Sequence, residues 1–513
     1  MFLKRINYDF LLRHCTVGSI KPSRMCTSME KDMPSGIDHR FFMNILGISR
    51  KDVDSMLAKH GKFYMLDKED VQESYDTLQE YKISDGILEY PGILTTSATT
   101  LKNRHGVLIE CSFSQVTLKI LHRYLTIMNK PISLVKTYGY IPQNANVAER
   151  LAEIVNSGKI IQEARKLEVT GTLNDLRRFF IDDFLRQKIQ ASEKDLQKIW
   201  HSYGRIRHRP IKTISQSIDL IRKEMNFSNE KILKHGYLLY GDPENTEKIL
   251  SMGTLLGVDI KEVLECHPKI LMSNHRSIKQ IVNILREHEI SDTAMQKNWL
   301  IFTLGPRTVA NRIAYLKEVE EFRVLLNHPR IGRLIYYQNK AIHRLNYLKD
   351  NKIFCASLNV LSSDSESFHR YAQNGIDATK GKEIVGTLAK KLNRNTKDIR
   401  KYLSRHPNWC HVPLVSISSV YEYLQQKGFT ESDIYKNIHI LFYPLAEITR
   451  KSEAIEREAL DFIKDINWKS LSKSQYLALI LYIIEIDFHF AGDGIWATNY
   501  IQSEKSEEAQ LSV

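Results

Sequence analysis

The sequence of residues 252–290, MGTLLGVDIKEVLECHPKILMSNHRSIKQIVNILREHEI, is the stretch from which the fold can be predicted. Apolar residues recur three or four positions apart on both sides of His267-Pro268: Ile260, Val263 and Leu264 before it, and Ile278, Ile281, Ile284 and Leu285 after it. This spacing places them on one face of an α-helix, and proline does not continue a helix interior. The stretch therefore predicts a short helix, a turn at the proline and a longer amphipathic helix.

The same pattern returns along residues 218–345 at steps of 29–32 residues. Two rows of positions, three residues apart, carry it: Ile218, Leu250, Ile281, Ile313 and Ile342, and Ile221, Gly253, Ile284, Leu316 and Leu345. Helical units that repeat at such a period stack so that each buries its apolar face on its neighbours. The predicted fold class is therefore all-α, an α-solenoid of tandem repeats of about 32 residues.

Prolines that follow an aliphatic residue by four positions extend the pattern in both directions: Pro91, Pro268, Pro329, Pro407 and Pro444. They predict a helical repeat array over residues 40–465, although residues 147–200 and 355–380 match the unit less well. A C-terminal helix is expected within residues 466–500. The polar, acidic residues 501–513 are expected to be a disordered tail.

The chain is basic, and the excess charge is concentrated in the regular repeats. Its 513 residues contain 73 Lys and Arg against 60 Asp and Glu, a net charge of +13. Residues 201–345 contain 23 Lys and Arg against 15 Asp and Glu, which is +8. Such a balance favours an anionic partner, nucleic acid or a membrane surface.

Several functional classes lack their sequence signatures. The six cysteines form no C-x-x-C pair, and Pro407 interrupts the group His406, Cys410 and His411, so we expect reduced thiols and no metal site. The sequence has neither of the phosphate-binding motifs G-x-x-x-x-G-K-[ST] and G-x-G-x-x-G, nor the zinc-binding motif H-E-x-x-H. The longest apolar run, residues 476–484, is too short to cross a bilayer. We expect no enzyme, no cofactor and no membrane partner.

Residues 1–35 differ in composition from the rest of the chain. Cations accompany Ser and Thr: Lys4, Arg5, Arg13, Lys21 and Arg24. Asp9 is the single acid before Glu30. This composition is typical of a mitochondrial targeting presequence, and it predicts a location in the matrix or nucleoid. The alternative is a basic tail without a targeting role.

The densest charge cluster is RIRHRPIK at residues 205–212, which has four cations and no acid: Arg205, Arg207, Arg209 and Lys212. One interpretation is a phosphate clamp that leads into a long helix from about Thr213. The other is a solvated loop. Further basic residues stand near the proline turns: Lys269, Arg276, Arg307, Arg312, Arg330, Arg333, Arg405 and Arg450. As a set they predict a basic face that follows a duplex, because phosphate neutralisation supplies most non-specific affinity.

The unit at residues 252–290 resembles the repeat of the mitochondrial transcription termination factor family. Its pattern is I/V-x-x-V/L-L-x-x-x-P-x-x-L between two helices. Looser copies are KLNRNTKDIRKYLSRHPNW at 391–409, QKGFTESDIYKNIHILFYPLAEI at 426–448 and YKISDGILEYPGIL at 81–94. Tyr237 and Leu300 stand where the pattern has proline. The details look most like the insect branch of the family.

The resemblance implies helix pairs joined by short 3-10-like turns and a groove for duplex nucleic acid. It also implies regulation of mitochondrial DNA transcription, at termination or arrest sites. Two alternatives remain open. The chain is either a protein-interaction scaffold that acts through another termination factor, or a ribosomal RNA binder in mitochondrial ribosome assembly. The resemblance further implies that aromatic residues near the turns stack on bases, for which Tyr240, Trp299, Phe302 and Tyr337 are candidates; the alternative is that they belong to the core.

Overall fold

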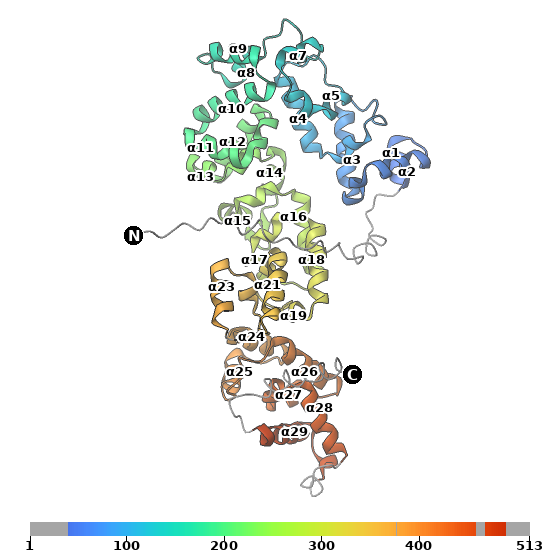
Figure 1. Cartoon of the computed structure of the whole chain (residues 1–513), viewed down its shortest axis with the longest axis vertical. Helices are drawn as coiled ribbons and strands as arrows, with labels where there is room; N and C mark the ends of the chain where they lie inside the picture. The colour runs from blue at the N-terminus through green and yellow to red at the C-terminus, as the bar shows by residue number, and fades with distance from the viewer. Residues whose placement is uncertain (1–38, 376, 458–466, 489–513) are drawn as a thin grey trace, which may run out of the picture. The chain divides into compact units, whose positions relative to one another are not determined.

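The computed structural model describes residues 39–375, 377–457 and 467–488, and these residues are mainly helical (Figure 1). The predicted presequence and the predicted tail lie outside the described residues. Contacts divide the chain into two compact units, Met1–Pro243 and Glu244–Val513. We call them the first and second units and describe each by itself.

The described part of the first unit consists of helices α1 to α13: α1 (His39–Leu46), α2 (Arg50–Lys59), α3 (Lys68–Glu80), α4 (Ala98–Glu110), α5 (Leu118–His122), α6 (Tyr124–Met128), α7 (Ile132–Thr137), α8 (Val147–Val155), α9 (Ile161–Thr170), α10 (Leu173–Ile189), α11 (Glu193–Tyr203), α12 (Ile211–Met225) and α13 (Asn229–Lys234). Short 3-10 helices are inserted between them: η3 (Gly61–Met65), η4 (Pro91–Thr95), η5 (Gly204–His208) and η6 (Gly236–Tyr240).

Helix α14 (Pro243–Leu250) begins at the last residue of the first unit. In the second unit the helices then follow one another in chain order (Figure 1): α15 (Ile260–Cys266), α16 (His275–Glu287), α17 (Asp292–Gln296), α18 (Pro306–Glu318), α19 (Glu320–Arg323), α20 (Ile331–Tyr336), α21 (Gln338–Asp350), α22 (Leu358–Ser362), α23 (Ser365–Asn374), α24 (Gly381–Lys391), α25 (Thr396–Leu403), α26 (Leu414–Gln426), α27 (Glu431–Lys436), α28 (Leu445–Glu456) and α29 (Lys473–Phe488). Its 3-10 helices are η7 (Pro268–Met272), η8 (Trp299–Thr303), η9 (Ile438–Phe442) and η11 (Trp468–Ser470).

The predicted all-α repeat fold is confirmed, and the repeat is visible in the 3-10 helices. From η5 to η8 they begin at residues 204, 236, 268 and 299, steps of 32, 32 and 31 residues. Each is five residues long, follows a short helix and precedes a longer one. The repeating unit is therefore a short helix, a 3-10 helix and a long helix.

Proline is not what produces this turn. Both η6 and η8 form although Tyr237 and Leu300 replace the proline. Conversely, Pro329 and Pro407 lie in turns outside any 3-10 helix. The first N–H groups of a helix have no partner within that helix, so proline is tolerated there without being required. Pro444 follows η9 as the N-cap of α28, so of the five prolines only Pro91 and Pro268 begin a 3-10 helix.

Most positions of the two predicted rows belong to the core, but Leu250, Ile284 and Ile342 are half-buried and Gly253 is exposed. Buried members of the first row are Ile218, Ile281 and Ile313. In α14, however, the residue buried completely is Ile249, while Leu250 is half-buried. Ile218, Ile249 and Ile281 are separated by 31 and 32 residues, so the buried positions keep the period of the repeat.

A two-residue hairpin precedes α15 and contains the only strands among the described residues. Strand β1 (Thr254–Leu255) pairs antiparallel with β2 (Val258–Asp259). The loop residues Leu256 and Gly257 have φ values of 55° and 79°, as a type I′ hairpin turn requires. The Asp259 carboxylate then accepts the N–H groups of Lys261 and Glu262, so the hairpin ends as the N-cap of α15.

No helix in the described segments combines the length and the apolar character that crossing a bilayer requires.

Candidate nucleic-acid interface

The basic stretch at residues 205–212 forms η5 and the first turn of α12, which begins at Ile211, two residues before the predicted start. The side chains of Arg205 and Lys212 are exposed. Arg207 is half-buried: its Nε donates to the Gly204 carbonyl at 2.8 Å, and its guanidinium lies 5.7 Å from the ring centre of Trp200. The stretch therefore divides into exposed and structural cations.

Arg209 is a core residue. Its side chain is 1% exposed, its guanidinium donates to the Gly241 carbonyl at the end of η6, and it lies 5.1 Å from the ring centre of Tyr240. Burial lowers the pKa of this guanidinium. The prediction that Arg209 contacts phosphate conflicts with this burial, because the side chain joins two successive 3-10 helices.

A buried ion pair that the sequence analysis missed positions this stretch. Arg177 on α10 is 0% exposed and donates to the Glu110 carboxylate at 2.7 Å. It also donates to the carbonyls of Arg207 and Arg209, at 3.0 and 2.6 Å. Glu110 in turn accepts the N–H groups of Ile211 and Lys212, at 3.1 and 3.3 Å. One buried pair thus binds the end of η5 and the start of α12.

The signal for this arrangement was present in the spacing, because Arg177 and Arg209 are 32 residues apart. The guanidinium group of each donates a hydrogen bond to a carbonyl at the end of the next 3-10 helix in the sequence. Arg312 and Arg344, in the second unit, are also 32 residues apart. An arginine that recurs at the repeat period in this chain therefore indicates a structural role as well as a positive charge.

Arg312 and Arg344 bind the C-terminal ends of short helices. Arg312 donates to the carbonyls of Ile335 and Tyr336 in α20, at 2.8 and 2.7 Å. The last carbonyls of a helix have no partner within it and form the negative end of its dipole, so they attract cations. Arg333 similarly donates to the Ser362 carbonyl that ends α22, at 3.1 Å. The prediction that Arg312 and Arg333 contact nucleic acid therefore conflicts with bonds that occupy them inside the unit.

Arg405 and Arg450 lie in the C-terminal repeats. Arg405 is exposed in the turn after α25, 5.1 Å from the ring centre of Tyr402. Arg450 on α28 forms two hydrogen bonds to the Glu447 carboxylate, at 3.0 and 2.5 Å. That carboxylate compensates the charge of Arg450, so the residue adds little to a basic surface.

The remaining predicted cations gather where the long helices begin. Lys212, Arg276 and Arg307 each occupy the second residue of a long helix, α12, α16 and α18 respectively. The first turns of these three helices contain no acid. The short helices between them have acids in their first turns: Glu230 in α13, Glu262 in α15 and Asp292 in α17. The long helix α14, which also lies between them in the sequence, has Glu244 in its first turn.

This charge placement is unfavourable for the helices themselves. A helix N-terminus is its positive end, so a cation there opposes the dipole by about 0.3–1 kcal/mol. A bound anion reverses the sign of that interaction, because it attracts the cation. The first N–H groups of α12 and α16 are already bonded to Glu110, Asn245 and Asn274, so the cations of α12, α16 and α18 are what favours a nearby anion.

In the second unit these first turns are neighbours. The 3-10 helices η7 and η8 pack against each other, as do α16 and α18, and α20 packs against η8. Exposed Lys269 lies on η7 and exposed Arg330 directly precedes α20. We call these four residues of the second unit, Lys269, Arg276, Arg307 and Arg330, the long-helix edge. Arg205 and Lys212 are exposed cations of the first unit and are not part of this edge.

Of the four aromatic candidates near the turns, Phe302 belongs to the core, and Tyr240, Trp299 and Tyr337 are half-buried. Phe302 is fully buried, and Trp299 packs against it with ring centres 6.1 Å apart. Tyr240 lies against Arg209. Tyr337 packs edge-on against Tyr336. For Phe302 the core interpretation is therefore correct.

His208, within the basic stretch, makes the first unit sensitive to acid. Burial and the nearby Arg207, Arg177 and Arg104 lower its pKa from 6.5 to about 4, and its Nδ1 lies 3.1 Å from the Tyr124 hydroxyl. Between pH 6.5 and 4 the unfolded chain binds a proton that the folded chain does not, so stability falls as the pH falls.

Acidification from pH 7 to pH 5 should lower the free energy of unfolding. We expect this loss to be about 1–2 kcal/mol smaller in the His208→Gln variant than in the wild type. Urea unfolding at the two pH values measures this difference. Equal losses in both proteins would show that His208 does not titrate in this way.

The fold defines the class of protein: an α-helical repeat protein, with exposed cations near the starts of long helices. No family model matches the chain, and no solved structure gives a significant match. Transcription termination factor 5, mitochondrial, of Drosophila melanogaster is 41% identical over 481 residues, which cover 92% of this chain and 86% of that protein. The chain therefore belongs to the mitochondrial transcription termination factor family, and it is mitochondrial.

A second relative is the N-terminal acetyltransferase A complex auxiliary subunit NAA15 of Arabidopsis thaliana. It is 24% identical over 243 residues, 46% of this chain and 26% of that protein. A match over a quarter of that protein carries no argument about function here. The family predicted from the repeat motif, and its insect character, are confirmed by the Drosophila protein.

Proposed function

We propose that this protein regulates transcription of mitochondrial DNA, at termination or arrest sites, by binding double-stranded DNA along the long-helix edge. Membership of the mitochondrial transcription termination factor family supports the process and the compartment. We further propose that it acts by binding without catalysis or a cofactor, and that residues 1–35 direct import.

One observation carries the proposal: the cations at the second residue of α12, α16 and α18, in first turns without acids. Each of these cations opposes the dipole of its own helix. Phosphates of a duplex are attracted to such cations. In the second unit α16 and α18 pack against each other, as do η7 and η8, so one duplex backbone could contact both helix ends.

The test is a salt titration of duplex binding, by fluorescence anisotropy, with the full chain. The edge variant replaces three exposed cations with alanine: Lys269, Arg307 and Arg330. Each lost phosphate contact flattens the plot of log affinity against log salt by about 0.9, so three contacts flatten it by roughly 2.7. Because phosphate contacts carry no base information, affinity should fall equally on specific and random duplexes.

The matched control removes three exposed cations from the last turns of α16, α18 and α19: Arg286, Lys317 and Arg323. It changes the net charge equally and should keep the wild-type slope. If both variants lose the same slope, general charge is responsible and the edge is not the interface. An absence of duplex affinity in the wild type at low salt would favour a scaffold that acts through another termination factor. Preference for ribosomal RNA over DNA would favour ribosome assembly.

A further inference from the structure

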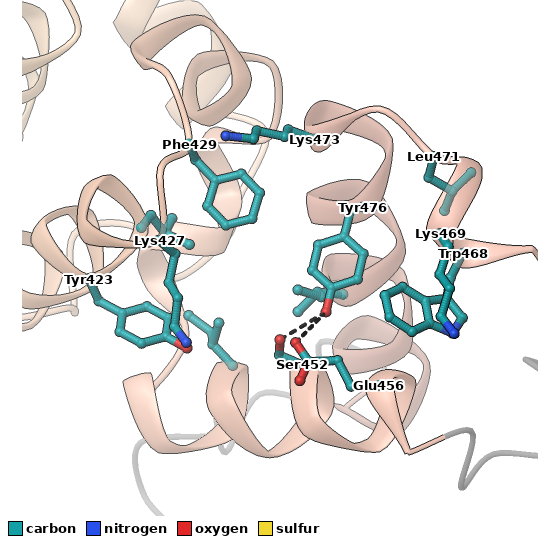
Figure 2. Close-up of a pocket in the computed structure, with 13 residues that line it drawn as sticks. Tyr423, Lys427, Phe429, Ser452, Glu456, Trp468, Lys469, Leu471, Lys473 and Tyr476 are labelled. Atoms are coloured by element: carbon teal, nitrogen blue, oxygen red, sulfur yellow. Dashed lines mark hydrogen bonds between the residues drawn. The ribbon is translucent and has the colours of Figure 1, made fainter.

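A pocket of about 300 Å³ lies in the second unit between α26, α28 and α29 (Figure 2). Its floor is apolar and buried, formed by Leu424, Ile448 and Ile480. The volume is at the low end of the range for small-molecule sites, about 300–1,000 Å³. None of its lining residues belongs to the long-helix edge.

Aromatic side chains from four segments surround this floor. Tyr423 comes from α26, Phe429 from the connection to α27, Trp468 from η11 and Tyr476 from α29 (Figure 2). The rings of Phe429 and Tyr476 are parallel within 7°, with centres 6.4 Å apart. The ring centre of Trp468 is 6.1 Å from that of Tyr476. Aromatic faces from several elements thus meet around one small space.

The Tyr476 ring is held in place by hydrogen bonds to its hydroxyl. That hydroxyl lies 3.0 Å from the Ser452 hydroxyl and donates to the Glu456 carboxylate at 3.5 Å (Figure 2). Both partners belong to α28, so the bonds join α29 to α28 beneath the pocket. A fixed ring loses little conformational entropy when a planar ligand stacks on it.

Exposed lysines line the rim of the pocket. Lys427 lies 5.7 Å from the ring centre of Tyr423, and Lys469 lies 5.3 Å from that of Trp468. Lys473 donates to the Gly428 carbonyl at 2.6 Å. Glu456 is the single acid among the lining residues, so the pocket has three cations against one anion.

We propose that this pocket binds a nucleotide unit, with the base on the aromatic walls and the phosphate at the lysine rim. Stacking on aromatic rings accepts any base, because every base has a π-face. The lysines supply charge for a phosphate. A simple phosphate ion makes no use of the apolar floor, and an uncharged apolar ligand makes no use of three lysines. The nucleotide comes either from a free mononucleotide or from a single strand.

The experiment measures binding to the full chain by isothermal titration calorimetry. The probes are AMP, adenosine, inorganic phosphate and a single-stranded DNA octamer. The rim variant is Lys427→Gln/Lys469→Gln/Lys473→Gln, and the wall variant is Phe429→Leu, which keeps apolar volume but removes a stacking face. We expect each variant to weaken binding of AMP, of the octamer or of both by at least about tenfold, with adenosine and phosphate binding more weakly than AMP.

Two controls separate the pocket from general effects. Lys382→Gln/Lys397→Gln/Lys401→Gln removes three exposed lysines from α24 and α25 and should bind as the wild type does. Trp468→Phe keeps an aromatic wall, so it should bind the nucleotide but lose the fluorescence quenching that ligand binding causes in the wild type.

The outcomes distinguish the sources. If the pocket variants lose binding of AMP, the ligand is a free nucleotide. If they lose binding of the octamer alone, the ligand is a single strand. If neither probe binds the wild type, or if both pocket variants bind normally, the proposal is overturned. Duplex binding through the long-helix edge involves other residues, so it should remain intact in the pocket variants, and either proposal can fail without the other.

Discussion

Replacing Arg177 with methionine should lower the free energy of unfolding by about 3–5 kcal/mol. The side chain is completely buried and binds one carboxylate and two carbonyls. Methionine leaves the Glu110 carboxylate buried without its cation. A buried charge that has lost its partner strongly destabilises the folded state. Urea unfolding followed by circular dichroism measures the loss.

The matched control is Arg186→Met on the same helix. Arg186 also forms an ion pair, with Glu193 at 2.8 Å, but both side chains are exposed. Exposed pairs contribute roughly 0–1 kcal/mol, so this variant should remain close to the wild type. The double variant Arg177→Met/Glu110→Leu should lose less than the sum of its single variants, because neither charge is then left alone. A loss below about 1 kcal/mol in Arg177→Met would contradict this role.

Arg344→Met should have the second large effect, about 2–4 kcal/mol of destabilisation. Arg344 is 6% exposed. It donates to the carbonyls of Val360, Leu361 and Ser363, at 3.1, 3.2 and 2.8 Å, and its guanidinium lies 4.4 Å from the ring centre of Phe368. The substitution leaves carbonyls at the end of α22 without a donor inside the core. Unfolding in urea again provides the measurement.

Two further variants test the reason for this loss. Arg344→Lys keeps the charge but cannot reach several carbonyls with one planar group, so it should remain clearly less stable than the wild type. Lys349→Met changes an exposed residue of the same helix, paired with Glu321 at 2.6 Å, and should change stability little. Full stability of Arg344→Lys would show that charge alone is needed there.

The repeat and its helical content could be predicted from the sequence because they depend on the local spacing of apolar residues. Apolar residues three or four apart in 252–290 define a helix face whatever surrounds them, and the recurrence of that face defines the stacking. The family followed from the same local motif. The 3-10 helix at Tyr237 and Leu300 was harder to predict, because backbone geometry forms it there without proline.

The roles of the cations were not accessible in the same way. In RIRHRPIK, Arg205 and Arg209 look alike in sequence, yet one is exposed and the other is buried against the next repeat. Arg312 and Arg333 looked like surface charge and proved to bind helix ends. The nucleotide pocket assembles residues from 423 to 480, which no short motif connects.

The sequence by itself determined the helices, their period, the basic character and the family, since each depends on residue types at short or regular spacings. Only the tertiary structure decided which arginines face solvent and which bind carbonyls, and where aromatic rings converge on a pocket. The physical reason is that a guanidinium suits phosphates and helix C-termini equally well. The choice between them depends on which neighbouring helix end lies within its reach.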